Sequence, residues 1–238
     1  MKRFFSPRAA AGLLVIAGLP ACAFVNDLIS GNTGPADVDD LVASVERVNS
    51  ELDASKTKLL GAVQTLQKVT APDFKGDAVE GHKELVRAID DSEDQTDDLR
   101  KSVERMQAEA EPVFNQWTKD LEGYSNPEMR QRSQARLAAA RERYDAVVAA
   151  VTPVLVECEA VNQTLGDHAL FLKHDMNPAA LATIQDDVKK VAKEAADLDG
   201  AFNAGKAATR AYVDSASQPK APPKSATPTD EKAVAVKG

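Results

Sequence analysis

The sequence predicts an all-α fold: an elongated, antiparallel up-and-down four-helix bundle with coiled-coil-like heptad seams. The main observation is that apolar residues recur at alternating spacings of three and four through four successive segments, as in helices that face partner helices along one stripe. Short turns with Pro, Gly and Asn separate the segments, so neighbouring helices should be antiparallel. The composition agrees, because 43% of the residues are hydrophobic but only 5% are aromatic, and Ala and straight-chain residues favour helices.

Residues 1–21 have the features of a cleaved targeting segment. Lys2, Arg3 and Arg8 form a basic start, and residues 9–19 form an apolar run. This run is shorter than the about 20 apolar residues that a transmembrane helix needs, and Pro20 interrupts it. An uncleaved membrane anchor is the alternative interpretation.

The stretch "LPAC", residues 19–22, resembles the lipobox of bacterial lipoproteins. The resemblance implies that the nucleophilic thiol of Cys22 receives a diacylglyceryl group, and that cleavage before Cys22 is followed by acylation of its amine. Several acyl chains hold a protein at a membrane far more firmly than one chain does. Ala23 follows the cysteine, and by resemblance to Gram-negative sorting signals this favours the outer membrane, facing the periplasm. We therefore expect a lipoprotein signal peptide (1–21), lipidation at Cys22, and the membrane as a partner through the acyl chains.

Residues 22–36 are predicted to be a lipidated tether. Gly31, Gly34 and Pro35 punctuate this stretch, and its apolar residues form no helical stripe long enough for a bundle helix. At the other end of the chain, residues 216–238 are rich in Pro, Ala and Lys and have no apolar face. We interpret them as a disordered tail, with contact to the cell wall as one use for its lysines.

The predicted helical domain, residues 37–215, contains four segments: 37–70, 77–122, 126–174 and 177–212. The second and third hold about 45 residues each, or roughly 65–70 Å at 1.5 Å per residue. The first is shorter, so the hairpin of the second and third should extend past it or bend at Pro112 and Pro153, where we predict kinks.

Three of the segments open with a helix start signal. Asp77 is followed three residues later by Glu80, which resembles a capping box. Asn126 and Asn177 are each followed by Pro, so that Asn caps the helix and Pro occupies its first position.

Two stretches of the body resemble a known family. They are "VFNQWTKDLEGYSNPEMRQRSQARLAAARERYD" (113–145) and "LFLKHDMNPAAL" (170–181), in which Leu172-Lys173-His174 followed by Asn177 is the most distinctive part. Over about residues 38–213 the chain resembles an uncharacterised family of Gram-negative envelope lipoproteins, domain of unknown function family 2959 (DUF2959). The resemblance implies an all-helical fold and an envelope location, and it implies no activity and no catalytic residues.

The cysteine and histidine positions favour structural roles. Cys158, the only other cysteine, falls on the third seam and is predicted to be a small buried side chain; a disulfide with Cys22 is the alternative. His168 lies on the same seam, so we expect it to be satisfied within the core. It is six residues from His174, whereas zinc motifs on helices use spacings of three or four. No metal site is expected.

The stretch "IDDSEDQTDDLR" (89–100) places six acidic residues beside Ser92 and Thr96, two polar positions on the second seam. It lacks the glycine and the ligand order of an EF-hand loop. We interpret it as a solvated acidic face at a weakly packed point of the bundle. Weak binding of a divalent cation is the alternative.

Three side chains near the predicted turns could face a partner: Trp117, Tyr124 and His174. Trp117 and Tyr124 flank the second turn, where core packing is the first expectation and an exposed aromatic docking patch is the alternative. His174 ends the third segment. There it would interact well with the helix dipole, and it could also shape the turn or contact a partner.

Charge and motif content exclude several function classes. The formal net charge is −8, and removal of residues 1–21, which hold three basic residues and no acidic one, would make it −11. Such a chain is a poor partner for nucleic acid or for an anionic bilayer surface. The sequence contains no Gly-rich phosphate loop, no G-x-S-x-G and no H-E-x-x-H pattern, so no enzymatic activity and no cofactor are expected.

These observations together predict a lipid-anchored periplasmic helical scaffold or adaptor of the bacterial cell envelope. Its expected partner is an envelope protein or a second copy of the chain. The alternative function is a carrier or chaperone-like protein that binds an apolar ligand within the bundle. Small seam residues such as Ala110, Ala140 and Gly205 would leave room for that ligand.

Overall fold

The computed structural model describes residues 35–216, and this part of the chain is all-helical, with five α-helices and no strand. The elements are α2 (Pro35–Val69), α3 (Ala78–Asp120), the 3-10 turn η1 (Leu121–Gly123), α4 (Pro127–His174), α5 (Pro178–Thr183) and α6 (Gln185–Ala216). The predicted signal peptide, the lipidation site Cys22 and nearly all of the predicted tether and tail lie outside the described residues. The helical part begins and ends within two residues of the predicted domain.

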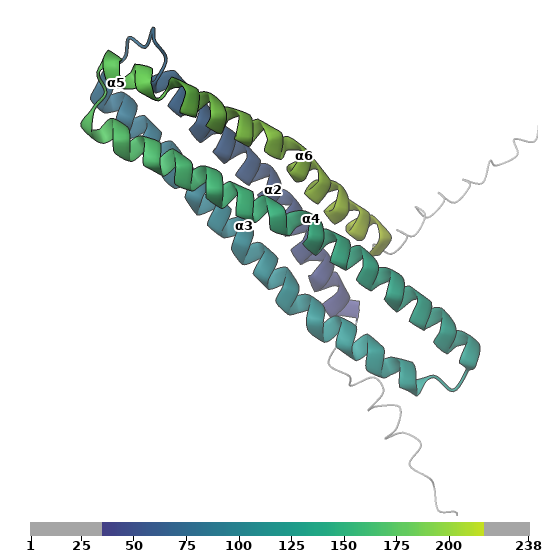
Figure 1. The fold of residues 1–238 in the computed structure, drawn as a ribbon. Coiled ribbons are helices and arrows are strands. Elements are labelled where there is room, and N and C mark those ends of the chain that lie inside the picture. Colours follow the sequence, from purple (N-terminus) through teal and green to yellow (C-terminus); the bar gives the residue numbers. More distant parts are fainter. Residues whose placement is uncertain (1–34, 217–238) are drawn as a thin grey trace, which may run out of the picture.

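The four long helices pack side by side as an elongated helical bundle (Figure 1). Each runs in the opposite direction to the long helix before it, and α2 and α4 each pack against both α3 and α6. Because α3 and α4 are longer than α2 and α6, their hairpin extends beyond the start of α2 and the end of α6, as the segment lengths predicted. We call this the hairpin end of the bundle, and we call the opposite end, which holds α5, the α5 end.

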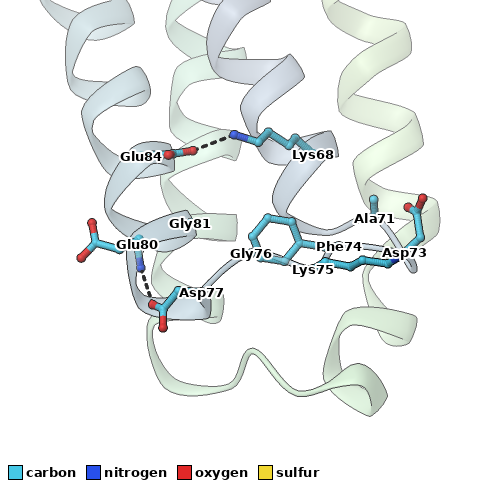
Figure 2. Close-up of a pocket in the computed structure, with 10 residues that line it drawn as sticks. All are labelled: Lys68, Ala71, Asp73, Phe74, Lys75, Gly76, Asp77, Glu80, Gly81 and Glu84. Atoms are coloured by element: carbon cyan, nitrogen blue, oxygen red, sulfur yellow. Dashed lines mark hydrogen bonds and ion pairs between the residues drawn. The ribbon is translucent and has the colours of Figure 1, made fainter.

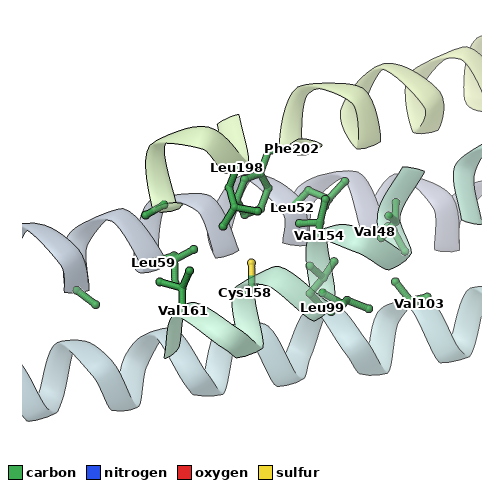
Figure 3. Packing of buried hydrophobic residues seen from close by; sticks show 14 of the residues in the cluster. Val48, Leu52, Leu59, Leu99, Val103, Val154, Cys158, Val161, Leu198 and Phe202 are labelled. Carbon is green, nitrogen blue, oxygen red and sulfur yellow. The ribbon is translucent and has the colours of Figure 1, made fainter. Parts of the chain in front are cut away.

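Most of the positions that the sequence pattern identified as apolar seams are buried. On α2, every seam residue after Val38 is buried: Leu41, Val45, Val48, Leu52, Ser55, Leu59, Ala62, Leu66 and Val69. Figure 3 shows side chains of all four long helices meeting, with Leu52, Leu99, Cys158 and Phe202 close together. Each large apolar side chain buried in this way contributes about 1.5–3 kcal/mol. Cys158 has no exposed surface, which confirms its predicted place in the core.

The predicted helix caps are present. Asp77, Asn126 and Asn177 each accept hydrogen bonds from the backbone N–H groups two and three residues ahead, at 2.9 to 3.2 Å. These bonds satisfy donors that the first turn of a helix leaves without partners. Each cap therefore fixes where α3, α4 or α5 begins.

The expectation of one continuous helix after Asn177 was wrong, because the chain breaks at Ile184 between α5 and α6. The Thr183 hydroxyl donates to the Ala180 carbonyl oxygen at 2.7 Å, competing with the helical pattern. The Gln185 side chain donates to the Leu181 carbonyl at 3.2 Å and, across the bundle, to the Thr70 carbonyl at 2.6 Å. The break is thus stabilised by a contact with the end of α2.

Both internal prolines lie on exposed sides of their helices, and α3 and α4 continue through Pro112 and Pro153. A proline removes one backbone hydrogen bond. On the outer side, water can satisfy the carbonyl left without a donor, so the buried seam is not interrupted.

Candidate interaction surface

The three predicted partner-facing residues lie at opposite ends of the bundle. Trp117 and Tyr124 are at the hairpin end, near the turn between α3 and α4, whereas His174 is the last residue of α4 at the α5 end. The 48 residues of α4 separate these ends, and at 1.5 Å per residue this is about 70 Å. The residues therefore belong to two separate surfaces.

At the hairpin end, a groove of about 820 Å³ lies where α2 begins, α6 ends and the hairpin continues. Val113 and Trp117 of α3 line it, together with Ala139 and Ala140 of α4 and Tyr212 of α6. Trp117 is half-buried, packs against the core, and donates from Nε1 to the Ser133 hydroxyl at 2.9 Å. It therefore combines the expected core packing with a place in an open groove.

The aromatic residues beside this groove stack edge to face. The ring of Tyr144 lies 5.4 Å from that of Phe114 and 6.3 Å from that of Tyr212, within the range that favours such pairs. The guanidinium of Arg141 lies over the Phe114 ring at 5.5 Å. Burial raises the pKa of Tyr144 and of Tyr212 to about 12. The same burial withdraws both rings from water, so the groove is bordered by a largely apolar wall.

Tyr124 is not part of this packing. It follows η1 in the turn, and 39% of its surface is exposed. Of the two aromatic residues considered for the hairpin end, only Trp117 packs against the core.

The α5 end carries an exposed apolar pair next to His174. Leu170 and Phe171, in the last turns of α4, are 59% and 41% exposed. Both are off the buried side of α4, which is formed here by Leu165, Ala169 and Leu172. Adjacent large apolar side chains left in water are typical of contact sites, so this pair together with His174 forms the candidate interaction surface.

The backbone beneath this surface is held by contacts between helices. His82 of α3 donates from Nε2 to the Ala169 carbonyl oxygen of α4 at 2.9 Å. His168 is only half-buried, not in the core as expected, and it donates to the Thr164 carbonyl of its own helix at 2.7 Å. The last turns of α4 are thus a fixed platform for Leu170 and Phe171.

A second hollow at this end lies beside the loop between α2 and α3 (Figure 2). Its volume is about 450 Å³, and the ring of Phe74 forms one wall. A Cβ atom on Gly81 would come within 2.9 Å of that ring, so glycine allows the close approach. The ion pair of Lys68 and Glu84, at 2.9 Å, lowers the pKa of the Glu84 carboxyl. The contact of Phe74 with Gly81 and the ion pair of Lys68 with Glu84 together hold the loop over the end of the bundle.

A polar layer crosses the seam beside the acidic stretch. Asn162 of α4 accepts a hydrogen bond from the Ser92 hydroxyl at 2.7 Å and donates one to the Thr96 hydroxyl at 3.1 Å. Ser55 of α2 donates to the Gln95 carbonyl at 3.3 Å. Sequence reasoning identified the serine and threonine positions but missed Asn162, because it lies one residue off the seam.

The acidic residues outside this layer face solvent, and several form ion pairs. Lys58 binds Asp91 at 2.7 Å, and Arg100 binds Glu159 at 2.7 Å. Partial burial, together with the neighbouring Asp residues, raises the pKa of Glu93. Within residues 35–216 no group of three or more His, Cys, Asp or Glu side chains is arranged to hold a metal ion.

Leu170 and Phe171 were also missed as candidates. The signal was present in the sequence, because two neighbouring large apolar residues fall between seam positions, where a bundle helix normally carries polar side chains.

Comparison with known proteins leads to one family. Neither a curated protein nor a solved structure matches the chain. The family described as "Protein of unknown function (DUF2959)" matches residues 31–215, a range that includes every helix described above except the last residue of α6. The chain therefore belongs to the DUF2959 family.

Proposed function

We propose that this protein is a lipid-anchored helical scaffold or adaptor of the bacterial cell envelope, without enzymatic activity, on the periplasmic side of the outer membrane. The observation that carries the proposal is the exposed pair Leu170 and Phe171, beside His174, at the end of a long packed bundle. A scaffold needs a rigid body and a defined contact surface, and these residues supply the surface.

The architecture that we propose for the rigid body is an antiparallel up-and-down four-helix bundle with coiled-coil-like seams. Burial of the predicted seam positions supports it, as do the opposite directions of successive long helices. Within residues 35–216, no helix combines the length and the apolarity required to cross a membrane. In this proposal the attachment to the membrane is made by acyl chains on Cys22.

The two ends of the bundle would then have different roles. α2 begins at the hairpin end, so a lipid anchor at Cys22, thirteen residues before Pro35, would lie on that side. The surface formed by Leu170, Phe171 and His174 would face away from the membrane, about 70 Å along α4. A partner bound there would be held at a fixed distance from the lipid surface.

Metabolic labelling with a fatty acid tests the anchor. The wild-type chain should incorporate the label and fractionate with outer membranes, and Cys22→Ala should abolish both. A wild-type chain that stays unlabelled in the soluble periplasm would contradict the proposal.

Photo-crosslinking in cells tests the partner surface. A photoreactive residue at Phe171 should trap one defined envelope protein or a second copy of this chain. The matched control is Val156, which is 61% exposed on the same helix but lies in the middle of the bundle. Equal products from both positions would show that the α5 end is no specific contact site.

The groove at the hairpin end favours a second candidate function, a carrier of an apolar ligand. Its volume of about 820 Å³ would hold a small molecule. The seam residues around Cys158 are fully buried, so such a ligand would bind at the end of the bundle rather than within it. Lipid found by mass spectrometry in the purified chain, and lost on Trp117→Ala, would support the carrier.

A further inference from the structure

We propose that residues 24–29 of this chain dock in the groove at the hairpin end, with Phe24, Leu28 and Ile29 as their apolar contacts. These residues lie outside the described part of the chain, and the proposal concerns where they bind. It depends on the shape of the groove, on the position of the start of α2, and on the residue types of both partners.

The groove has room for large apolar side chains. Its α4 wall is built from Ala135, Ala139 and Ala140, whose side chains are small, and Trp117 stands opposite on α3. Along most of the bundle, α2 and α6 cover this inner side of the hairpin, but α2 begins and α6 ends here, and the hairpin extends beyond both. The groove is therefore the place where a further segment could continue the covering.

The N-terminal segment is the nearest available chain. Val38, in the first turns of α2, lines the groove itself. Only residues 30–34 separate Ile29 from Pro35, and five extended residues reach at most about 17 Å. A segment tethered so closely has an effective concentration in the millimolar range, so even a weak contact would be populated.

The residue types match the groove. Phe24, Val25, Leu28 and Ile29 are spaced so that a helical turn would bring them to one face. Two turns are too short to form a stable helix in water, so this face requires a surface to fold against.

Charge complementarity points the same way. Arg136 and Arg143 line the groove, and Nε of Arg143 is buried without a hydrogen-bond partner among the described residues. Asp27 of the segment supplies a carboxylate, the natural partner of a guanidinium.

The C-terminal tail also starts beside this groove, since Ser215 and Ala216 line it. Residues 217–238, however, contain no Leu, Ile, Met or aromatic residue, and lysines outnumber acidic residues there. The tail would bring positive charge toward two arginines, so the N-terminal segment is the better occupant.

Docking would set how close the bundle lies to the membrane, a consequence that rests on the proposed lipid anchor at Cys22. Extended, residues 22–34 would span about 45 Å. With residues 24–29 docked, only Ala23 separates the segment from Cys22. The hairpin end would then be held at the lipid surface.

The fluorescence of Trp117, the only tryptophan of the chain, tests the docking. The full chain in lipid nanodiscs should show a red-shifted emission and stronger quenching by acrylamide when Phe24, Leu28 and Ile29 are replaced by Ser. The control replaces Val234 and Val236 of the tail by Ser, which should leave the emission unchanged. Emission unaffected by the N-terminal substitutions, or shifted equally by the control, would overturn the proposal.

Crosslinking provides the second test and identifies the occupant. In the full chain, Leu28→Cys with Ala139→Cys should be joined within one molecule by a short bismaleimide. Leu28→Cys with Ala160→Cys should not, because Ala160 is exposed on the same helix as the half-buried Ala139 but lies about 30 Å further along. Leu28→Cys alone reports any reaction with Cys22 or with the buried Cys158.

The outcomes separate this proposal from the proposed function. A crosslink in a chain that incorporates no fatty acid would refute the proposed lipid anchor and support the proposed docking. A crosslink between two molecules would assign the groove to a second copy of the chain. The absence of any Leu28–Ala139 product would refute the docking, but it would not contradict the proposed lipid anchor or the proposed contact surface at the α5 end.

Discussion

The polar layer around Asn162 offers a quantitative test of how the bundle interior is held together. Asn162 is 4% exposed, its Oδ1 accepts from Ser92 at 2.7 Å, and its Nδ2 donates to Thr96 at 3.1 Å. Asn162→Ala removes both hydrogen bonds and leaves a small cavity. Ser92→Ala removes one of the bonds and leaves the amide oxygen of Asn162 without its donor.

The magnitudes follow from these bonds. Two hydrogen bonds at about 1 kcal/mol each, with the lost packing, give a destabilisation of about 2–3 kcal/mol for Asn162→Ala. For Ser92→Ala we expect about 1–2 kcal/mol, since one bond is lost and one acceptor is left unsatisfied. The double variant should lose less than the sum of the single variants, by about 1 kcal/mol, because each single substitution already breaks the shared bond.

Urea unfolding of the four chains, followed by the helical circular dichroism signal, measures these free energies. The control pair is Asn162→Ala with Ser44→Ala, because Ser44 is also buried but donates within its own helix, to the Leu41 carbonyl at 2.9 Å. That pair should be additive. If the effects of Ser92→Ala and Asn162→Ala are also additive within about 0.3 kcal/mol, the hydrogen bond between them contributes nothing to stability and the reasoning fails.

Three further predictions concern the core and the loop. Burial raises the pKa of the Cys158 thiol from 9.0 to about 12. As the pH rises, the thiol therefore ionises in the unfolded chain before it ionises in the folded one. The free energy of unfolding should fall between about pH 9 and pH 12. Cys158→Ala should lessen that fall in urea melts, and an unchanged slope would contradict it. Gly81→Ala should lower the melting temperature, because the new Cβ would lie 2.9 Å from the Phe74 ring; in a Phe74→Ala chain the same change should be neutral or stabilising, since Ala favours helices. Phe202 is 1% exposed at the centre of the core. In urea unfolding, Phe202→Ala should lower the free energy of unfolding by about 3–5 kcal/mol. A decrease below about 1 kcal/mol would mean that the core collapses around the gap.

The local features of the fold were readable from the sequence because neighbouring residues encode them. The alternating spacing of apolar residues identified the buried seam of α2 from Leu41 to Val69. Asp77, Asn126 and Asn177 marked the starts of their helices, since a cap is made with N–H groups only two and three residues away. The same pattern located Cys158 correctly in the core.

The candidate site was less predictable, because it depends on what remains uncovered after packing. His174 was chosen from its place at a helix end, and it proved to lie beside Leu170 and Phe171, which the sequence reasoning had passed over. Trp117 was expected in the core, and its place in a groove arises because α2 begins and α6 ends beside it.

By itself, the sequence determined the helical class, the buried faces and the helix starts. These follow from the spacing of apolar residues along the chain and from hydrogen bonds between near neighbours. The tertiary structure alone decided the break at Ile184, the hydrogen bonds of Asn162 and the groove at the hairpin end. Each of these joins parts of the chain that are far apart in sequence: Gln185 reaches the carbonyl of Thr70, and Asn162 reaches Ser92. Such contacts form only when the helices pack together, so no local sequence pattern predicts them.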